Sequence, residues 1–185
     1  MESQESQDST ATVVEQDRHE VLYFAYGSNL STAQMRARCP SSTPVGLAVL
    51  PGWRWSINAR GYANALPPTH PCFPLAPPTT PAEGVHGLVY LLPPRDEASL
   101  DVHEGVRSGA YGKVRCKVRW VRDGEAGEGE EVEALVYVDE KRAEKGTPRE
   151  EYVGRMEAGI EDAVRNWGMD EEYANKVMRT WWKTA

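Results

Sequence analysis

Two neighbouring segments with a strict two-residue alternation constrain the fold of this chain more than any other feature. From 113 to 122 apolar side chains alternate with Lys and Arg, and from 131 to 139 small apolar side chains recur at every second position. This spacing places the apolar side chains on one face of a half-buried strand. The Gly- and Glu-rich stretch 123–130 predicts a turn or flexible loop between them. Together the two segments predict an antiparallel hairpin.

Three further segments are predicted to be strands. Residues 21–26 are rich in Val, Leu, Tyr and Phe, residues 46–58 alternate weakly, and residues 86–92 form a short apolar run. Residues 67–81 contain seven of the thirteen prolines. Proline cannot donate a hydrogen bond to a β-ladder, so this stretch is predicted to be a loop.

Capping residues mark the first two helices. Ser31 and Gln34 have the spacing of a capping box at the start of a short helix that ends at Cys39-Pro40. Residues 96–104 are predicted to be a helix, because Gly105 stands where a left-handed residue commonly ends one.

The C-terminal part of the chain is predicted to be helical. Thr147 is the predicted N-cap of a long helix that Gly168 ends, and Asp170 is the predicted cap of a last helix. Strands dominate the first three quarters of the chain and helices the end. We therefore predict an α+β fold, a small mixed, mostly antiparallel β-barrel that is flanked by helices.

Length and charge limit the domain count and the partners. The 185 residues suit a single domain over 20–185, preceded by a polar, disordered N-terminal tail over 1–19 that has no apolar signal region. No run approaches the ~20 apolar residues of a transmembrane helix, so no membrane association is predicted. The net charge of −7 disfavours nucleic acid, because phosphate backbones require a basic face.

Cysteine and histidine usage predicts a chain without metal or cofactor. The three cysteines include no C-x-x-C pair, and the four histidines show no metal-ligand spacing. Free thiols fit a reducing compartment, so a cytoplasmic location is expected. Cys116 lies on the apolar face of a predicted strand and is expected in the core.

A glycine turn follows the first predicted strand. Tyr26-Gly27-Ser28-Asn29-Leu30 joins that strand to a helix start, and Gly27 permits backbone conformations that other residues avoid. Successive backbone N–H groups near a helix N-terminus can bind an anion. The chain has no phosphate-loop pattern here, so a carboxylate is the natural guest. The alternative is an ordinary strand-to-helix turn.

Glu104 is the candidate acid/base. The last turn of a helix and partial burial both disfavour a charged carboxylate, and both raise its pKa towards neutrality. A solvated glutamate is the alternative. His103 is a rival base, but adjacent helix positions diverge by about 100°, so the two side chains are not expected to face one pocket.

The turn and Glu104 together resemble the γ-glutamyl cyclotransferase family, the AIG2-like group. Residues 23–30 match the family's glycine-loop signature without a gap, and 88–90 match the strand before its catalytic helix. Residues 100–106 and the Ser-Gly-x-Tyr of 108–111 match the block with its catalytic glutamate. The resemblance spans roughly residues 20 to 165.

The resemblance implies an enzyme with one catalytic carboxyl group. Family members convert γ-glutamyl amino acids into 5-oxoproline and a free amino acid through attack of the substrate's own α-amine, with no cofactor. Glu104 is implied as the general acid/base. The implied substrate-binding residues are Tyr23, Phe24, Ala25, Tyr26, Gly27, Ser28, Asn29, Tyr111 and Tyr152.

Several points stay open at this level. Residues 55–64 and the proline-rich stretch depart from the animal enzymes, which leaves the pocket wall undefined. A sister activity on glutathione or on a glutathione-derived conjugate, and a non-catalytic small-molecule binding module, are the alternatives. Trp181-Trp182 is a candidate contact of a homodimer, with packing against the same domain as the equal alternative.

Overall fold

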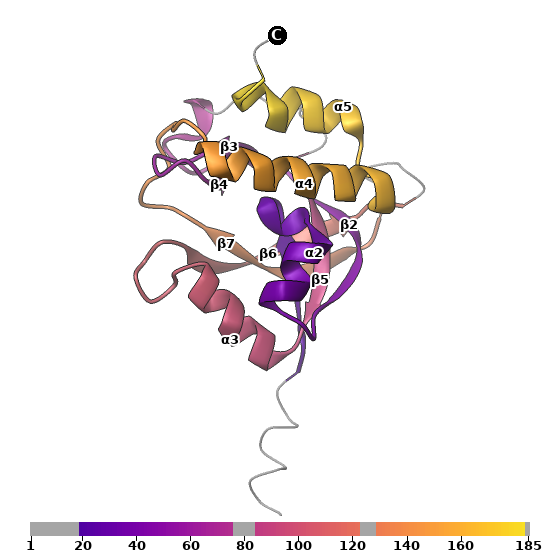
Figure 1. Ribbon diagram of the computed structural model, residues 1–185. Helices are drawn as coiled ribbons and strands as arrows, with labels where there is room; N and C mark the ends of the chain where they lie inside the picture. The colour runs from indigo at the N-terminus through magenta and orange to yellow at the C-terminus, as the bar shows by residue number, and fades with distance from the viewer. Residues whose placement is uncertain (1–18, 76–83, 123–128, 184–185) are drawn as a thin grey trace, which may run out of the picture.

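The fold is an α+β arrangement around a closed barrel (Figure 1). The structure is a computed structural model that describes residues 19–75, 84–122 and 129–183. The strands are β1 (Val21–Ala25), β2 (Thr43–Leu50), β3 (Arg54–Ile57), β4 (Ala63–Leu66), β5 (Val85–Leu92), β6 (Gly112–Trp120) and β7 (Glu131–Val138). The α-helices are α2 (Thr32–Arg38), α3 (Pro94–His103), α4 (Glu150–Trp167) and α5 (Glu171–Tyr173). Shorter helical turns are η1 (Ser28–Leu30), η2 (Phe73–Leu75), η3 (Ala174–Met178) and η4 (Arg179–Trp181).

The barrel has the strand order β1-β5-β2-β6-β7 and closes between β1 and β7. The closing pair is parallel, with Tyr23 opposite Leu135, and the other neighbours are antiparallel. The predicted hairpin is confirmed, because β6 and β7 pair from Gly112 opposite Val138 to Arg119 opposite Glu131. The predicted fold class, a mostly antiparallel barrel with flanking helices, is confirmed as well.

The single strand predicted over 46–58 is wrong. A turn at Pro51-Gly52 divides this stretch, and Gly52 has a φ of 76°, which favours glycine. The first part belongs to β2 in the barrel, whereas β3 pairs with β4 in a separate two-stranded sheet. The β3–β4 hairpin, residues 54–66, therefore lies outside the barrel ladder.

Residues 76–81 of the predicted loop and residues 123–128 of the predicted turn lie outside the described ranges. From 67 to 75 the chain forms turns and the short η2, and no strand is present in this described part. The tail predicted over 1–19 also lies outside the described residues, apart from His19.

Helix ends follow their capping residues at most positions. The Ser31 hydroxyl accepts a hydrogen bond from the Gln34 N–H at 3.2 Å, as a cap does. Gly105 and Gly168 end α3 and α4 with φ values of 63° and 78°. Asp170 caps α5 by accepting a hydrogen bond from the N–H of Glu172.

The N-cap predicted at Thr147 is wrong. The long helix α4 starts at Glu150, and Arg149 is its N-cap without a side-chain hydrogen bond. The preceding segment stays extended because the β3–β4 hairpin holds its backbone. The Gly146 N–H donates to the Ile57 carbonyl at 3.0 Å, and the Arg149 N–H donates to the Gly61 carbonyl at 3.2 Å.

Helix α4 packs over the glycine turn, between the barrel and the C-terminal helical segment (Figure 1). Gly159 permits this close approach, since a Cβ there would lie 3.1 Å from the Leu30 Cβ. Met156 and Ile160 of α4 are fully buried in the core. Gly159 thus lets α4 approach the glycine turn closely.

The C-terminal tryptophans pack within the chain. Trp181 and Trp182 contact the buried ring of Trp55 edge-on, with ring centroids 6.1 and 6.4 Å apart. This is the intramolecular alternative left open by the sequence. Cys116 is half-buried and packs against the core. Across the described ranges, no helix combines the length and apolar character needed to cross a membrane.

Candidate active site

A cavity of about 260 Å³ opens where the glycine turn, the end of α3, the β3–β4 hairpin and α4 meet. Eight of the predicted site residues line it: Tyr23, Tyr26, Gly27, Ser28, Asn29, Glu104, Tyr111 and Tyr152. The predicted site residues Phe24 and Ala25 do not line it; both are fully buried in β1. The structure therefore brings the turn and the glutamate, which are far apart in sequence, to one cavity.

Gly27 is needed for close approach rather than for a left-handed backbone. Its φ is −114°, but a Cβ there would lie 2.9 Å from the Tyr152 Oη and 3.1 Å from the Ala63 Cβ. The Tyr152 hydroxyl accepts hydrogen bonds from the N–H groups of Ser28, at 3.3 Å, and Ala63, at 3.4 Å. Glycine thus leaves room for Tyr152 beside the turn.

The side chain of Asn29 connects the turn to Glu104. Its Oδ1 accepts hydrogen bonds from Gln34 Nε2 at 2.8 Å and Arg38 Nη1 at 3.1 Å. These two donors orient the amide so that Nδ2 donates to Tyr23 Oη at 3.0 Å and to Glu104 Oε1 at 3.2 Å. Helix α2 therefore fixes the Asn29 amide that contacts Glu104.

The hydroxyl of Ser28 is held from two helices. It accepts hydrogen bonds from Gln34 Nε2 at 2.8 Å and from Arg155 Nη2 at 3.0 Å. Arg155 Nε also donates to Gln34 Oε1 at 3.0 Å. Gln34 thus links α2, α4 and the turn, instead of reaching back to Ser31 as a reciprocal capping box would require.

Glu104 has the protonation behaviour of an acid/base that works near neutral pH. Burial raises its pKa from 4.5 to about 7, although the charges of Arg38, Arg155 and Arg60 and the Asn29 hydrogen bond lower it. The residue follows the last turn of α3, where its N–H donates to the Leu100 carbonyl at 2.8 Å. Burial is the leading cause of the raised pKa.

His103 also borders the cavity, so the expectation that it and Glu104 would not share one pocket is wrong. The helix ends between the two residues, and Gly105 then turns the chain. The ideal helical separation of adjacent side chains therefore no longer applies. The His103 side chain is mostly exposed. Its partial desolvation lowers its pKa, and the nearby Arg38 charge lowers it further.

Tyrosine hydroxyls complete the wall as neutral groups. Tyr111 Oη donates to the Ala63 carbonyl at 2.7 Å, and Tyr26 Oη donates to the Tyr137 carbonyl at 2.5 Å. Burial holds the pKa of Tyr26 and Tyr111 well above 10 and raises that of Tyr152 to about 12. These hydroxyls keep their protons at neutral pH, so they do not compete with Glu104 as proton acceptors.

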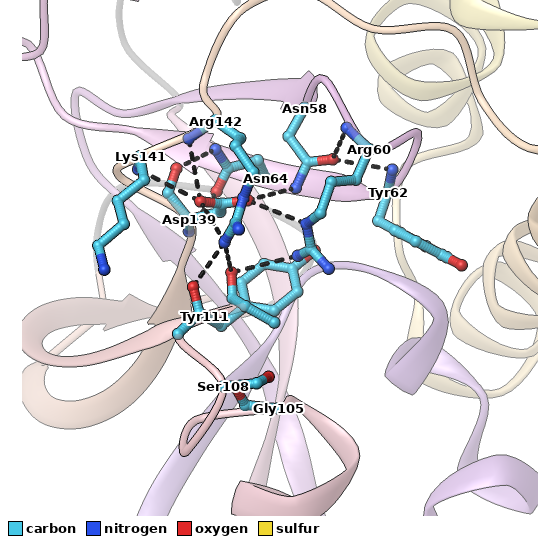
Figure 2. Close-up of polar contacts among 12 residues, drawn as sticks. Asn58, Arg60, Tyr62, Asn64, Gly105, Ser108, Tyr111, Asp139, Lys141 and Arg142 are labelled. Carbon is cyan, nitrogen blue, oxygen red and sulfur yellow. Dashed lines mark hydrogen bonds and ion pairs between the residues drawn. The ribbon is translucent and has the colours of Figure 1, made fainter.

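Three arginines line the cavity, and the sequence did not indicate two of them, Arg38 and Arg155. The third, Arg60, lies in residues 55–64, whose role the sequence left open. Arg60 is fixed on the hairpin by Asp139, which also binds Arg142 (Figure 2). Three guanidinium groups near one carboxyl group suit a ligand that carries negative charge. In the described part of the chain, no cluster of His, Cys, Asp or Glu side chains could hold a metal ion.

The fold and the site define an α+β barrel protein with one arginine-lined cavity that contains a glutamate of raised pKa. The chain belongs to the AIG2-like family, whose model matches residues 84–176. This matched segment includes Glu104, Tyr111 and Tyr152 but begins after the glycine turn.

Individual relatives extend the match. The chain is 32% identical to the gamma-glutamylcyclotransferase of Bos taurus over 106 residues, which cover 56% of this chain and 54% of the bovine protein. It is 26% identical to the Mus musculus protein of the same name over 162 residues, 88% of this chain and 79% of that protein. The bovine match thus spans about half of that relative's length.

A solved structure with the name gamma-glutamyl cyclotransferase shares the fold. It superposes with a TM-score of 0.65 at 27% identity, and the match covers 86% of each chain. The shared architecture therefore extends over most of both chains.

Proposed function

We propose that this chain is a γ-glutamylcyclotransferase that converts γ-glutamyl amino acids into 5-oxoproline and free amino acids. One observation carries the proposal: Glu104, with a pKa of about 7, accepts a hydrogen bond from the glycine turn inside a cavity lined by arginines. The names of the bovine and mouse relatives support the same activity.

The proposed reaction is a cyclisation within the substrate. The α-amine attacks the γ-carbonyl carbon, a new C–N bond closes a five-membered ring, and the bond to the departing amine breaks. The Glu104 carboxylate takes a proton from the α-ammonium group, and the resulting acid returns a proton to the departing nitrogen. A group with a pKa near 7 can perform both transfers at neutral pH.

The glycine turn would hold the glutamyl part of the substrate in a folded conformation. We assign the α-carboxylate to the backbone N–H groups of Gly27 and Ser28. The Ser28 N–H now donates to Tyr152 Oη at 3.3 Å, a long hydrogen bond that a carboxylate oxygen would replace. Arg38 and Arg155 bind the side chains of the turn and add positive charge there. Fixing the amine near the carbonyl accounts for much of the expected rate gain.

The decisive experiment measures 5-oxoproline release from γ-glutamyl-alanine by the full chain and by its Glu104→Gln variant. Loss of the acid/base should lower kcat by a factor of about 10² to 10⁴ while substrate binding is kept. Glu161→Gln, on the exposed surface of α4, is the matched control. Near-normal turnover by Glu104→Gln would refute the assignment.

A substrate panel separates the related activities. γ-Glutamyl-alanine, glutathione and γ-glutamyl-lysine should be assayed side by side, and the proposal expects the highest kcat/KM for γ-glutamyl-alanine. A clear preference for glutathione would instead indicate the sister activity. Binding of all three without release of 5-oxoproline would indicate a non-catalytic member of the fold.

A further inference from the structure

Arg60 contacts a different part of the cavity wall from the other two arginines. Arg38 and Arg155 bind the glycine turn, whereas Arg60 donates from Nη2 to the Ala110 carbonyl at 3.2 Å. Its guanidinium group lies over the ring of Tyr111, 4.9 Å from the centroid. The cavity therefore has two separate cationic regions: Arg38 and Arg155 at the turn, and Arg60 on the β3–β4 hairpin.

The conformation of Arg60 is fixed before any ligand binds. Its Nε contacts Asp139 Oδ2 at 3.2 Å, and its backbone N–H donates to Asn58 Oδ1 at 3.1 Å (Figure 2). The ring of Tyr62 lies 5.6 Å from its guanidinium carbon on the same hairpin. A guanidinium group held in this way loses little conformational entropy when it binds a carboxylate.

The cluster around Asp139 keeps a positive charge. Asp139 is 1% exposed, and its carboxylate contacts both Arg60 and Arg142, the latter through Nε at 3.1 Å (Figure 2). One carboxylate balances only one of the two guanidinium charges. Arg60 lines the cavity and Arg142 does not, so Arg60 presents this charge to a ligand.

A γ-glutamyl amino acid carries two carboxylates, one on each side of the bond that breaks. The glycine turn accounts for the carboxylate of the glutamyl part under the proposed function, on which this inference rests. We infer that Arg60 is a specificity-determining residue that binds the carboxylate of the released amino acid. The site then selects γ-glutamyl amino acids over γ-glutamyl amines, which lack this group.

The test compares γ-glutamyl-alanine with γ-glutamyl-alaninamide, which replaces only the second carboxylate by a neutral amide. Arg60→Gln should lower kcat/KM for γ-glutamyl-alanine by a factor of about 10 to 100, mainly through KM, as expected for a charge-assisted hydrogen bond. The kcat/KM for γ-glutamyl-alaninamide should fall much less, since a neutral amide forms no ion pair with Arg60. Because the Arg60 charge also lowers the pKa of Glu104, both substrates are compared at about pH 9, where Glu104 is ionised in either protein. Arg60→Lys should recover part of the preference, because it keeps the charge.

Arg142→Gln is the matched control, because Arg142 binds the same carboxylate and the same Ala110 carbonyl outside the cavity. It should leave the ratio of the two kcat/KM values unchanged. An unchanged ratio in Arg60→Gln, or an equal shift in Arg142→Gln, would overturn the inference while the cyclisation itself persists. If the unsubstituted protein releases 5-oxoproline from neither peptide, the proposed function fails and the inference fails with it.

Discussion

The raised pKa of Glu104 predicts that replacing this residue stabilises the protein at alkaline pH. Burial disfavours the carboxylate, so the neutral acid is the form that the folded state prefers. The neutral acid adds to the free energy of unfolding. This stabilisation is fully present below pH 4.5 and is lost as the pH rises through about 7. Glutamine is neutral at every pH, so Glu104→Gln does not suffer this loss.

The size of the effect follows from the two pKa values. The interval from 4.5 to about 7 corresponds to about 3 kcal/mol of unfolding free energy, because each pKa unit is worth about 1.4 kcal/mol. About 2 kcal/mol of this should develop between pH 5.5 and pH 8.5. The variant should therefore gain that much stability relative to the unsubstituted protein across this range.

Urea unfolding followed by tryptophan fluorescence can measure the difference, since Trp55 is fully buried. Both proteins should be unfolded at several pH values from 5.5 to 8.5, with Glu161→Gln as a control that alters an exposed carboxyl group. A difference that stays flat across the range would refute the burial argument. A variant that becomes less stable than the unsubstituted protein at pH 8.5 would show that the arginines favour the charged form.

Three further outcomes test the site. The kcat/KM for γ-glutamyl-alanine should rise with pH through about 7, because Glu104 must be deprotonated to act as the base; a pH–rate profile checks this. Asn29→Ala should move this rise to higher pH, since its hydrogen bond lowers the pKa of Glu104; an unmoved profile would contradict that role. Gly27→Ala should raise KM at least about tenfold, because the added methyl group would lie 2.9 Å from Tyr152 Oη. Tyr152→Phe in the same chain should relieve this contact, and KM measurements on both variants decide the point.

Local sequence predicts four of the barrel strands, β1, β5, β6 and β7, because each carries its own signal, whereas it merges β2 with β3. Alternation identifies β6 and β7, and Gly105 and Gly168 end their helices in the left-handed conformation that they favour. The predictions fail where a distant segment decides the structure. Thr147 precedes α4 without capping it because the hairpin residue Gly61 binds the backbone of this segment.

In the candidate site, too, local sequence indicates some residues, and the packing of distant segments places the others. Glu104 and the glycine turn each lie in a contiguous motif, so the sequence alone selects them as candidates, and the structure places both at one cavity. Arg38 shares the last turn of α2 with Arg36, and nothing in the local pattern shows which of the two faces the turn. Arg155 reaches Ser28 only because α4 packs over it. Such contacts depend on how the helices are placed, which the residues nearby in sequence do not encode.

The separate sheet of β3 and β4 has a consequence for how substrate range can diverge. The turn follows barrel strand β1 and Glu104 follows the flanking helix α3, whereas Arg60 belongs to a hairpin with its own hydrogen-bonded ladder. Under the proposed function, changes in residues 54–66 would alter the choice of leaving group and leave Glu104 itself in place. Grafting this hairpin between relatives would then change selectivity, provided that the contacts of Ala63 with Tyr111 and Tyr152 are kept.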